Sequence, residues 1–117
     1  METQFITVDD ASALNEWMER SRREPVVLFK HSTTCPISSA AYREMERVGA
    51  EIGLVVVQRA RGVSREVAER TGVRHESPQV FVLRDGAVVW TASHYDVTAD
   101  AVKQAVSEHQ GSVEADN

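Results

Sequence analysis

Short apolar runs alternate along this chain with segments whose apolar residues recur at helical spacing. VVLF (26–29) and LVVV (54–57) contain no polar residue, which is typical of strands buried on both faces of a sheet. FITV (5–8) is a shorter strand candidate ahead of them. Strand–helix–strand repeats place parallel strands side by side with right-handed crossovers. The alternation therefore predicts an α/β sheet covered by helices on both faces.

Helix signals lie between these strands. Asp9 or Asp10 is expected to cap a first helix, Pro25 to follow its end, and Pro36 to occupy the first turn of a second helix. KHSTT (30–34) is expected to form the loop before Pro36. The second helix is predicted to bury one face, which is formed by Ala41, Met45, Val48 and Ile52.

The second half of the chain adds two helices and a hairpin. Ser64 is a candidate cap for a third helix that Gly72 ends, and Thr98 is expected to cap the last helix. QVFVL (79–83) and AVVWTA (87–92) flank an Asp-Gly pair, which is typical of a tight hairpin. The complete order is β-α-β-α-β-α-β-β-α, so the central sheet is predicted to be mixed.

The length of 117 residues suits one domain, which we expect to span residues 1–109. Residues 110–117 are poor in apolar side chains and are predicted to form a disordered tail. No leader-like segment and no apolar stretch of roughly 20 residues occurs, so neither secretion nor a membrane partner is expected. The net charge of −5, with scattered basic residues, argues against nucleic acid as a partner.

A single cysteine, Cys35, limits the possible chemistry. It cannot form a disulfide within the chain, and secreted domains of this size usually carry several cysteines, so a cytoplasmic location is expected. A structural zinc site normally needs four Cys or His ligands, and the four histidines are scattered. We therefore expect no metal site.

Cys35 is predicted to lie at the turn from a buried strand to a helix. Thiol exchange needs the thiolate, which free N–H groups at a helix amino terminus favour. We assign catalysis to Cys35 and support of its thiolate to Thr34, Pro36 and Ser38. Ser38 stands where a Cys-x-x-Cys motif has its second cysteine, and its hydroxyl could donate to the thiolate or be simply a polar first-turn residue. Because Ser38 cannot resolve a mixed disulfide, a second thiol must come from solution. A buried structural cysteine is the competing interpretation.

Ser77-Pro78 comes directly before the fourth predicted strand. A cis peptide bond there would expose the Ser77 backbone to a peptide-like ligand, so both residues are assigned to substrate binding. His94 joins them, because its segment should approach the Cys35 end of the sheet.

Several other polar residues have two interpretations each. His31 and His75 could tune a thiolate or contact an anionic ligand, although lone histidines are more often structural. Arg59 and Arg61 could form part of an anion-binding rim, although surface charge is the simpler interpretation. Lys30 is expected to be solvated at the end of its strand.

Two segments of the chain resemble the monothiol bacilliredoxins, the YtxJ family of the bacillithiol system. They are FKHSTTCPISSAAY (29–42) and VRHESPQVF (73–81), and the resemblance extends over roughly residues 3 to 109. It implies a thioredoxin fold and a redox role with bacillithiol, a small thiol that replaces glutathione in some bacteria. It also implies that Cys35 is the active cysteine and Pro78 the cis-proline.

The chain departs from two better-known relatives of that fold. Phe29 stands six positions before Cys35, where thioredoxins carry a buried Asp that assists the resolving thiol. TASHYDVT (91–98) occupies the region in which glutaredoxins hold glutathione with a Gly-Cys-Asp-Asp type segment. Both departures fit a monothiol mechanism that does not use glutathione.

The leading hypothesis is an oxidoreductase that removes bacillithiol from protein mixed disulfides through Cys35. Bacillithiol would be a co-substrate and no cofactor would be tightly bound; the partners would be bacillithiolated proteins and a low-molecular-weight thiol. Two alternatives remain open: an iron–sulfur cluster carrier that resembles monothiol glutaredoxins, and a non-catalytic peptide-binding module. The protein targets, the recycling reductant and the oligomeric state stay undetermined.

Overall fold

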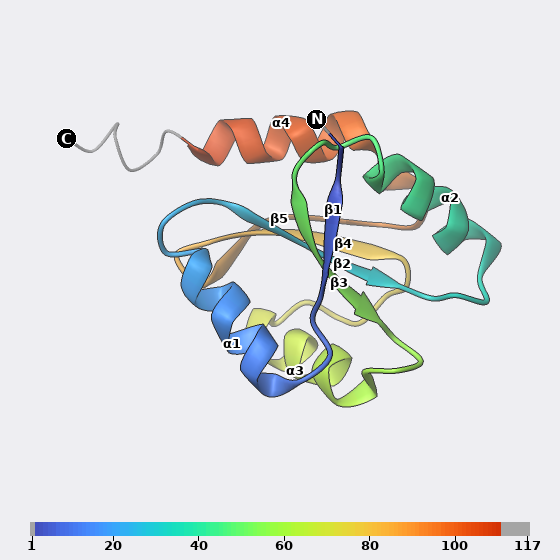
Figure 1. Ribbon diagram of the computed structural model, residues 1–117, viewed down its shortest axis with the longest axis horizontal. Coiled ribbons are helices and arrows are strands. Elements are labelled where there is room, and N and C mark those ends of the chain that lie inside the picture. The colour runs from blue at the N-terminus through green and yellow to red at the C-terminus, as the bar shows by residue number, and fades with distance from the viewer. Residues whose placement is uncertain (1, 111–117) are drawn as a thin grey trace.

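A mixed five-stranded sheet forms the centre of the molecule (Figure 1). The computed structural model describes residues 2–110. The strands are β1 (Gln4–Thr7), β2 (Val26–His31), β3 (Glu51–Val56), β4 (Gln79–Arg84) and β5 (Ala87–Ser93). Their order across the sheet is β1-β3-β2-β4-β5; β1 and β2 run parallel to β3, and β4 is antiparallel to both β2 and β5. The predicted mixed sheet and element order are confirmed.

Helices cover both faces of this sheet. The helices are α1 (Ala11–Arg20), α2 (Pro36–Met45), α3 (Arg61–Thr71) and α4 (Ala99–Gln110), with a short 3₁₀ helix η1 (His94–Asp96) before α4. Figure 1 shows α1 and α3 on one side of the sheet and α2 and α4 on the other. The disordered tail was predicted at 110–117, but Gln110 is the last residue of α4, and residues 111–117 lie outside the described residues.

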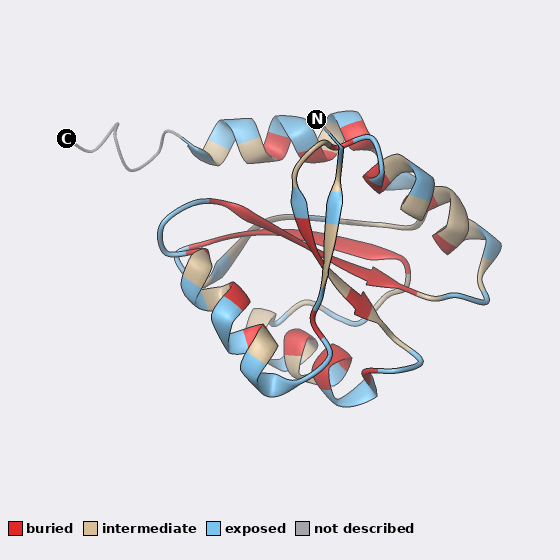
Figure 2. Ribbon diagram, viewed as in Figure 1, coloured by how far each residue is buried: buried red, intermediate tan, exposed pale blue. Residues whose placement is uncertain are grey.

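The two layers are packed by alternating side chains of the central strands. In β2, Val27 and Phe29 join the core beneath α2 and α4, whereas Val26 and Leu28 join the core beneath α1 and α3. All residues of β2 and β4 are buried, which Figure 2 shows as red strands at the middle of the sheet. Continuous apolar runs are what a strand covered on both faces requires.

The end of β2 differs from the prediction. Lys30 and His31 belong to the strand rather than to the following loop, and both side chains are buried. They are tolerated there because each polar group finds a partner: the Lys30 ammonium donates to the Ser64 carbonyl, and His31 is hydrogen-bonded to Ser38. The expectation that Lys30 is solvated was wrong.

Two helix boundaries also differ from the prediction. α2 ends at Met45, and Gly49, with φ of 73°, turns the chain so that Ile52 lies in β3 instead of on the helix. α3 begins at Arg61, so Ser64 is a buried residue inside the helix and not its cap.

The predicted caps and hairpin are otherwise confirmed. The Asp10 carboxylate accepts from the Ala13 N–H at the start of α1, and Gly72 ends α3 in the left-handed conformation. Asp85 and Gly86 both have positive φ angles, 55° and 75°, as a type I′ hairpin turn requires.

The topology brings three segments to one end of the sheet. β2 and β3 are parallel, so their carboxyl ends point the same way, toward the start of α2 (Figure 1). Lys30 pairs with Gln79 in the antiparallel β2–β4 ladder, so the residues that follow β2 lie beside those that precede β4. Within residues 2–110, the structure contains no helix with the length and apolarity needed to cross a bilayer.

Replacing Gly53 with Ala should lower the stability of the fold. A Cβ at Gly53 would lie 2.8 Å from Trp17 Cε2 and 3.0 Å from Leu28 Cδ1, and Trp17 is held by a 3.0 Å hydrogen bond from its Nε1 to the Val27 carbonyl. We expect Gly53→Ala to reduce the free energy of unfolding by about 1–3 kcal/mol in urea titration, as overpacking does. Gly62→Ala is the matched control: its Cβ would meet nothing within 4 Å, so no loss is expected. Equal effects of the two substitutions would contradict the packing explanation.

Candidate active site

Cys35 is the N-cap residue of α2, and Pro36 follows as its first helical residue. Its carbonyl accepts the first helical hydrogen bond, from the Ser39 N–H at 3.0 Å. The Cys35 side chain is partly exposed and makes no capping bond. The free N–H groups of the first turn and the positive end of the helix dipole therefore lie beside the sulfur, and both stabilise an anion. The predicted position at a strand-to-helix turn is confirmed.

Gln58, just after β3, holds the loop that carries Cys35. Its side-chain amide donates to the hydroxyls of Ser32, at 2.8 Å, and Thr34, at 3.2 Å, while its carbonyl oxygen accepts from the Thr33 N–H at 3.3 Å. The hydroxyl of Thr34, which was expected to support the thiolate, is engaged in this contact. Gln58 was not singled out in the sequence, because no motif links it to residues 24 to 26 positions away.

Ser38 is fully buried beneath the start of α2, and its hydroxyl has two partners. The oxygen accepts from the Ser32 N–H at 2.9 Å and lies 2.8 Å from His31 Nδ1. In the part of the chain that the structure describes, no hydrogen bond joins Ser38 to the Cys35 sulfur. The hydroxyl thus ties the Cys35 loop to β2, and its predicted role of donating to the thiolate stays a prediction.

His31 is held in an aromatic cluster below Ser38. Its ring centroid lies 4.9 Å from that of Tyr42 and 5.6 Å from that of Phe29. Burial lowers the pKa of His31, an effect that the hydrogen bond with Ser38 partly opposes. His31 is therefore neutral at neutral pH, and Phe29, at the position of the buried Asp of thioredoxins, is also uncharged.

The segment before β4 reaches the same end of the sheet. The Ser77–Pro78 peptide bond is cis, as predicted. The Pro78 carbonyl accepts from the His94 N–H at 3.0 Å, and His94 Nε2 lies 3.5 Å from a Glu76 carboxylate oxygen. His94 also lines a pocket together with Ile37 of α2. The structure thus brings Ser77, Pro78 and His94 to the end of the sheet where Cys35 lies.

Lys30 forms a second polar cluster on the opposite face of β2. Its ammonium donates to the Ser64 carbonyl at 2.9 Å and to His75 Nδ1 at 3.1 Å, and it lies 5.8 Å from the centre of the Phe81 ring. Burial lowers the pKa of Lys30 to about 8. Partial burial and the Lys30 charge lower the pKa of His75, with Glu76 acting in the opposite direction. Lys30 therefore remains mostly charged at neutral pH while His75 is neutral.

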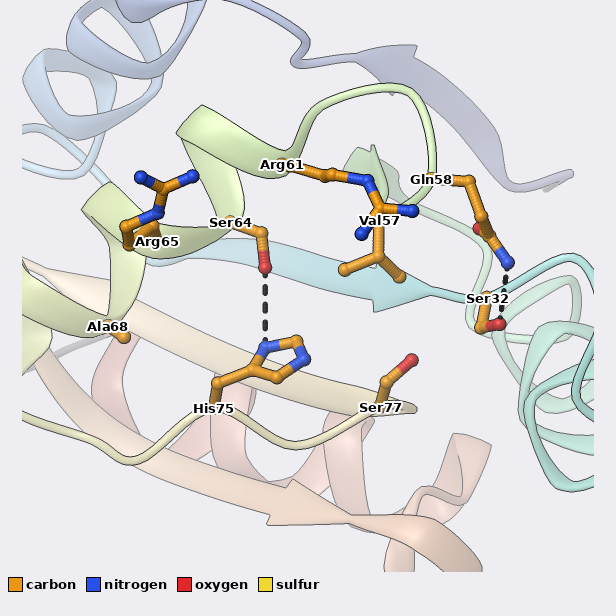
Figure 3. A pocket seen from close by; sticks show the side chains of 9 residues that line it. All are labelled: Ser32, Val57, Gln58, Arg61, Ser64, Arg65, Ala68, His75 and Ser77. Atoms are coloured by element: carbon orange, nitrogen blue, oxygen red, sulfur yellow. Dashed lines mark hydrogen bonds between the residues drawn. The ribbon is translucent and has the colours of Figure 1, made fainter.

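A cavity of about 570 Å³ opens above this cluster (Figure 3). Arg61, Arg65 and His75 line it, and Ser32 and Ser77 lie at one end. The anion-binding rim proposed for Arg59 and Arg61 is thus revised: Arg65 rather than Arg59 faces the cavity. No three His, Cys, Asp or Glu side chains gather at metal-binding geometry within residues 2–110.

A sequence model of the family described as monothiol bacilliredoxin BrxC matches residues 6–102. The chain belongs to this family. The match includes the Cys35 turn, the Ser77–Pro78 bond and the start of the last helix. A bacilliredoxin-family chain with the cysteine at the amino terminus of α2 is a redox protein of thioredoxin fold.

Solved structures agree with this family assignment. A protein described as an oxidoreductase with a thioredoxin fold shares 31% sequence identity with this bacilliredoxin, with a TM-score of 0.80, over 86% of this chain and 92% of the other. Thioredoxin (Mala s 13) of Malassezia sympodialis has 14% identity and a TM-score of 0.70 over 93% of this chain and 92% of its own. Thioredoxin NaTrxh of Nicotiana alata has 14% identity and a TM-score of 0.71 over 94% and 96%. The two thioredoxins show the fold alone.

The stability of this bacilliredoxin should depend on pH through Lys30. Its pKa of about 8 lies below the ordinary 10.5, so the unfolded chain binds this proton more strongly. The contribution of Lys30 to the free energy of unfolding therefore rises with pH between about 8 and 10.5. We expect wild type to gain stability relative to Lys30→Met as pH rises from 7.5 to about 10, measured by urea unfolding at each pH.

The matched control for this pH effect is Lys103→Met. Lys103 is the other lysine and is exposed on α4, so it lacks the burial that produces the effect at Lys30. A wild-type minus Lys30→Met difference that stays flat across this window would show that Lys30 does not titrate as a buried group.

Proposed function

We propose that this bacilliredoxin removes a low-molecular-weight thiol, bacillithiol, from protein mixed disulfides by one-thiol exchange. The observation that supports it most is the pairing of an isolated, partly exposed Cys35 at the start of α2 with a buried serine, Ser38, at the position of a resolving cysteine. The chain holds no second sulfur nucleophile, since Cys35 is its only cysteine. A reduced cysteine of this kind needs a reducing compartment, so the cytoplasm is the proposed location.

The exchange proceeds in two steps that each break one disulfide and form one. The Cys35 thiolate attacks the bacillithiol sulfur of the protein–bacillithiol disulfide, and the electron pair of the broken bond leaves with the protein sulfur as a thiolate. Cys35 now carries bacillithiol. A second low-molecular-weight thiolate then attacks the bacillithiol sulfur, which yields a disulfide between the two small thiols and releases the Cys35 thiolate. No cofactor takes part, and the oxidation moves from the protein to the small thiol.

The geometry of the site favours both steps of this exchange. The amino terminus of α2 stabilises negative charge on Cys35, which makes it a nucleophile in the first step and a good leaving group in the second. Ser38 and neutral His31 fill the space behind the loop with a satisfied hydrogen bond, so no charged acid or base is buried there. Such a site has a thiolate that can form a mixed disulfide but no second thiol that can resolve it within the chain.

Purified protein mixed with a bacillithiolated peptide should stop after one turnover. Intact-mass spectrometry is expected to show one bacillithiol on Cys35 and an equal amount of reduced peptide. Added bacillithiol should restart release, because attack from solution is the only route left. Cys35→Ala should form no adduct and leave the peptide modified. Transfer by Cys35→Ala would overturn the proposal.

Introducing a thiol at position 38 should remove the stall. In Ser38→Cys the new sulfur follows Cys35 at Cys-x-x-Cys spacing, so it can attack the mixed disulfide and expel bacillithiol as a thiolate. Mass spectrometry should then show an internal disulfide and free bacillithiol. Ser38→Ala is the control, since it loses the same contacts with His31 and Ser32 but should still stall as wild type does. Persistent adduct on Ser38→Cys would contradict the role assigned to this position.

A further inference from the structure

The cavity beside α3 is positively charged in a chain whose net charge is negative. Among the described residues, its lining contains Arg61 and Arg65 and no Asp or Glu, whereas the whole chain has a net charge of −5. Both arginines are exposed and form no ion pair within residues 2–110. They lie one helical turn apart, so their side chains share a face of α3. An unpaired cationic pair of this kind is free to meet an anion from solution.

His75 adds an N–H donor to the cavity, and its contact with Lys30 decides which ring nitrogen carries the proton. The Lys30 ammonium has only protons to offer, so His75 Nδ1, 3.1 Å away, must accept. The neutral ring then carries its proton on Nε2. Figure 3 shows this second ring nitrogen turned away from Ser64, toward the space between Val57 and Ser77. Lys30, which has no carboxylate partner in the described part of the chain, thus places positive charge behind the cavity and a donor inside it.

Glu76, the acidic residue nearest to His75 in sequence, acts on His75 but does not line the cavity. Its carboxylate lies 3.5 Å from His94 Nε2. The Ser77 hydroxyl, at the end beside the Cys35 loop, is buried and has no hydrogen-bond partner among the described residues. A polar group of a ligand at that end would satisfy it.

The position of the cavity connects it with the thiol. Ser32 at one end belongs to the loop that leads into Cys35, and Ser77 precedes the cis-proline (Figure 3). Arg65 lies toward the other end. A ligand whose sulfur is at Cys35 would extend its remaining atoms past Ser32 and Ser77 toward the arginines. The volume of about 570 Å³ suits a small molecule.

We propose that the cavity lined by Arg61, Arg65 and His75 binds the carboxylate-bearing part of the small thiol that Cys35 exchanges. The inference rests on the proposed exchange at Cys35 and adds a specificity: the guanidinium groups and the His75 N–H bind carboxylate oxygens. Neutral thiols of similar reactivity lack this contact. The cavity thereby selects the thiol while Cys35 performs the exchange.

The test compares one peptide that carries bacillithiol, an anionic thiol, with the same peptide that carries neutral 2-mercaptoethanol. Wild type should transfer the anionic thiol faster, and added salt should reduce the preference. In Arg61→Ala/Arg65→Ala the ratio of the two rates should fall about tenfold or more, and in Arg61→Lys/Arg65→Lys it should recover in part. Arg59→Ala is the control: Arg59 is exposed but does not line the cavity, so the ratio should stay at its wild-type value.

A binding measurement separates this inference from the proposed exchange. Cys35→Ala cannot form a disulfide, so reduced bacillithiol titrated into it should shift the His75 ring signals in NMR, and the arginine double substitution should abolish the shift. An unchanged rate ratio in Arg61→Ala/Arg65→Ala, or an equal fall in Arg59→Ala, would overturn the inference and leave the exchange intact. Transfer from neither peptide would overturn the exchange, and the titration would still decide whether the cavity binds the anion.

Discussion

The double pairing of β2 is the constraint on which the rest of this bacilliredoxin depends. β2 is hydrogen-bonded to β3 on one side and to β4 on the other, and all its residues are buried. Its last residues therefore have fixed positions, and the loop that follows must start from the carboxyl end of the sheet. α2 begins there with Cys35 at its amino terminus, and the cis-proline segment lies alongside because Lys30 pairs with Gln79. The site is thus a consequence of where the central strand ends.

The alternation of side chains along a strand then divides this end into two faces. Lys30 and His31 are neighbours in the chain, but successive side chains of a strand point to opposite sides of the sheet. His31 lies on the face of α2, where it contacts Ser38 and Tyr42. Lys30 lies on the face of α3, where it contacts Ser64 and His75. Two adjacent polar residues thus belong to two different clusters on opposite faces of the sheet.

The sequence predicted the order of elements and the position of Cys35 well, because both depend on local patterns. Apolar runs, the Asp-Gly turn and Pro36 after Cys35 each carry their meaning within a few residues. The same local patterns failed at Ile52, whose spacing from Met45 suits a helix although Gly49 has already turned the chain into β3. They failed again at Lys30, since a buried lysine is recognised only from partners 34 and 45 positions away. Gln58 was missed for the same reason: its three contacts with the Cys35 loop are made across the sheet.

The different charges of the two clusters have a physical reason. Next to Cys35, a buried charge would act on the thiolate at short range, and burial keeps His31 neutral there. On the other face of the sheet, positive charge can accumulate without entering the Cys35 loop, because the body of β2 and the Phe81 ring lie around the Lys30 ammonium. A lysine that donates to a carbonyl and a neutral imidazole keeps its charge uncompensated, whereas a carboxylate partner would cancel it. The strand thus places the charge that a carboxylate ligand would meet on one face of the sheet and neutral His31, next to the sulfur that reacts, on the other.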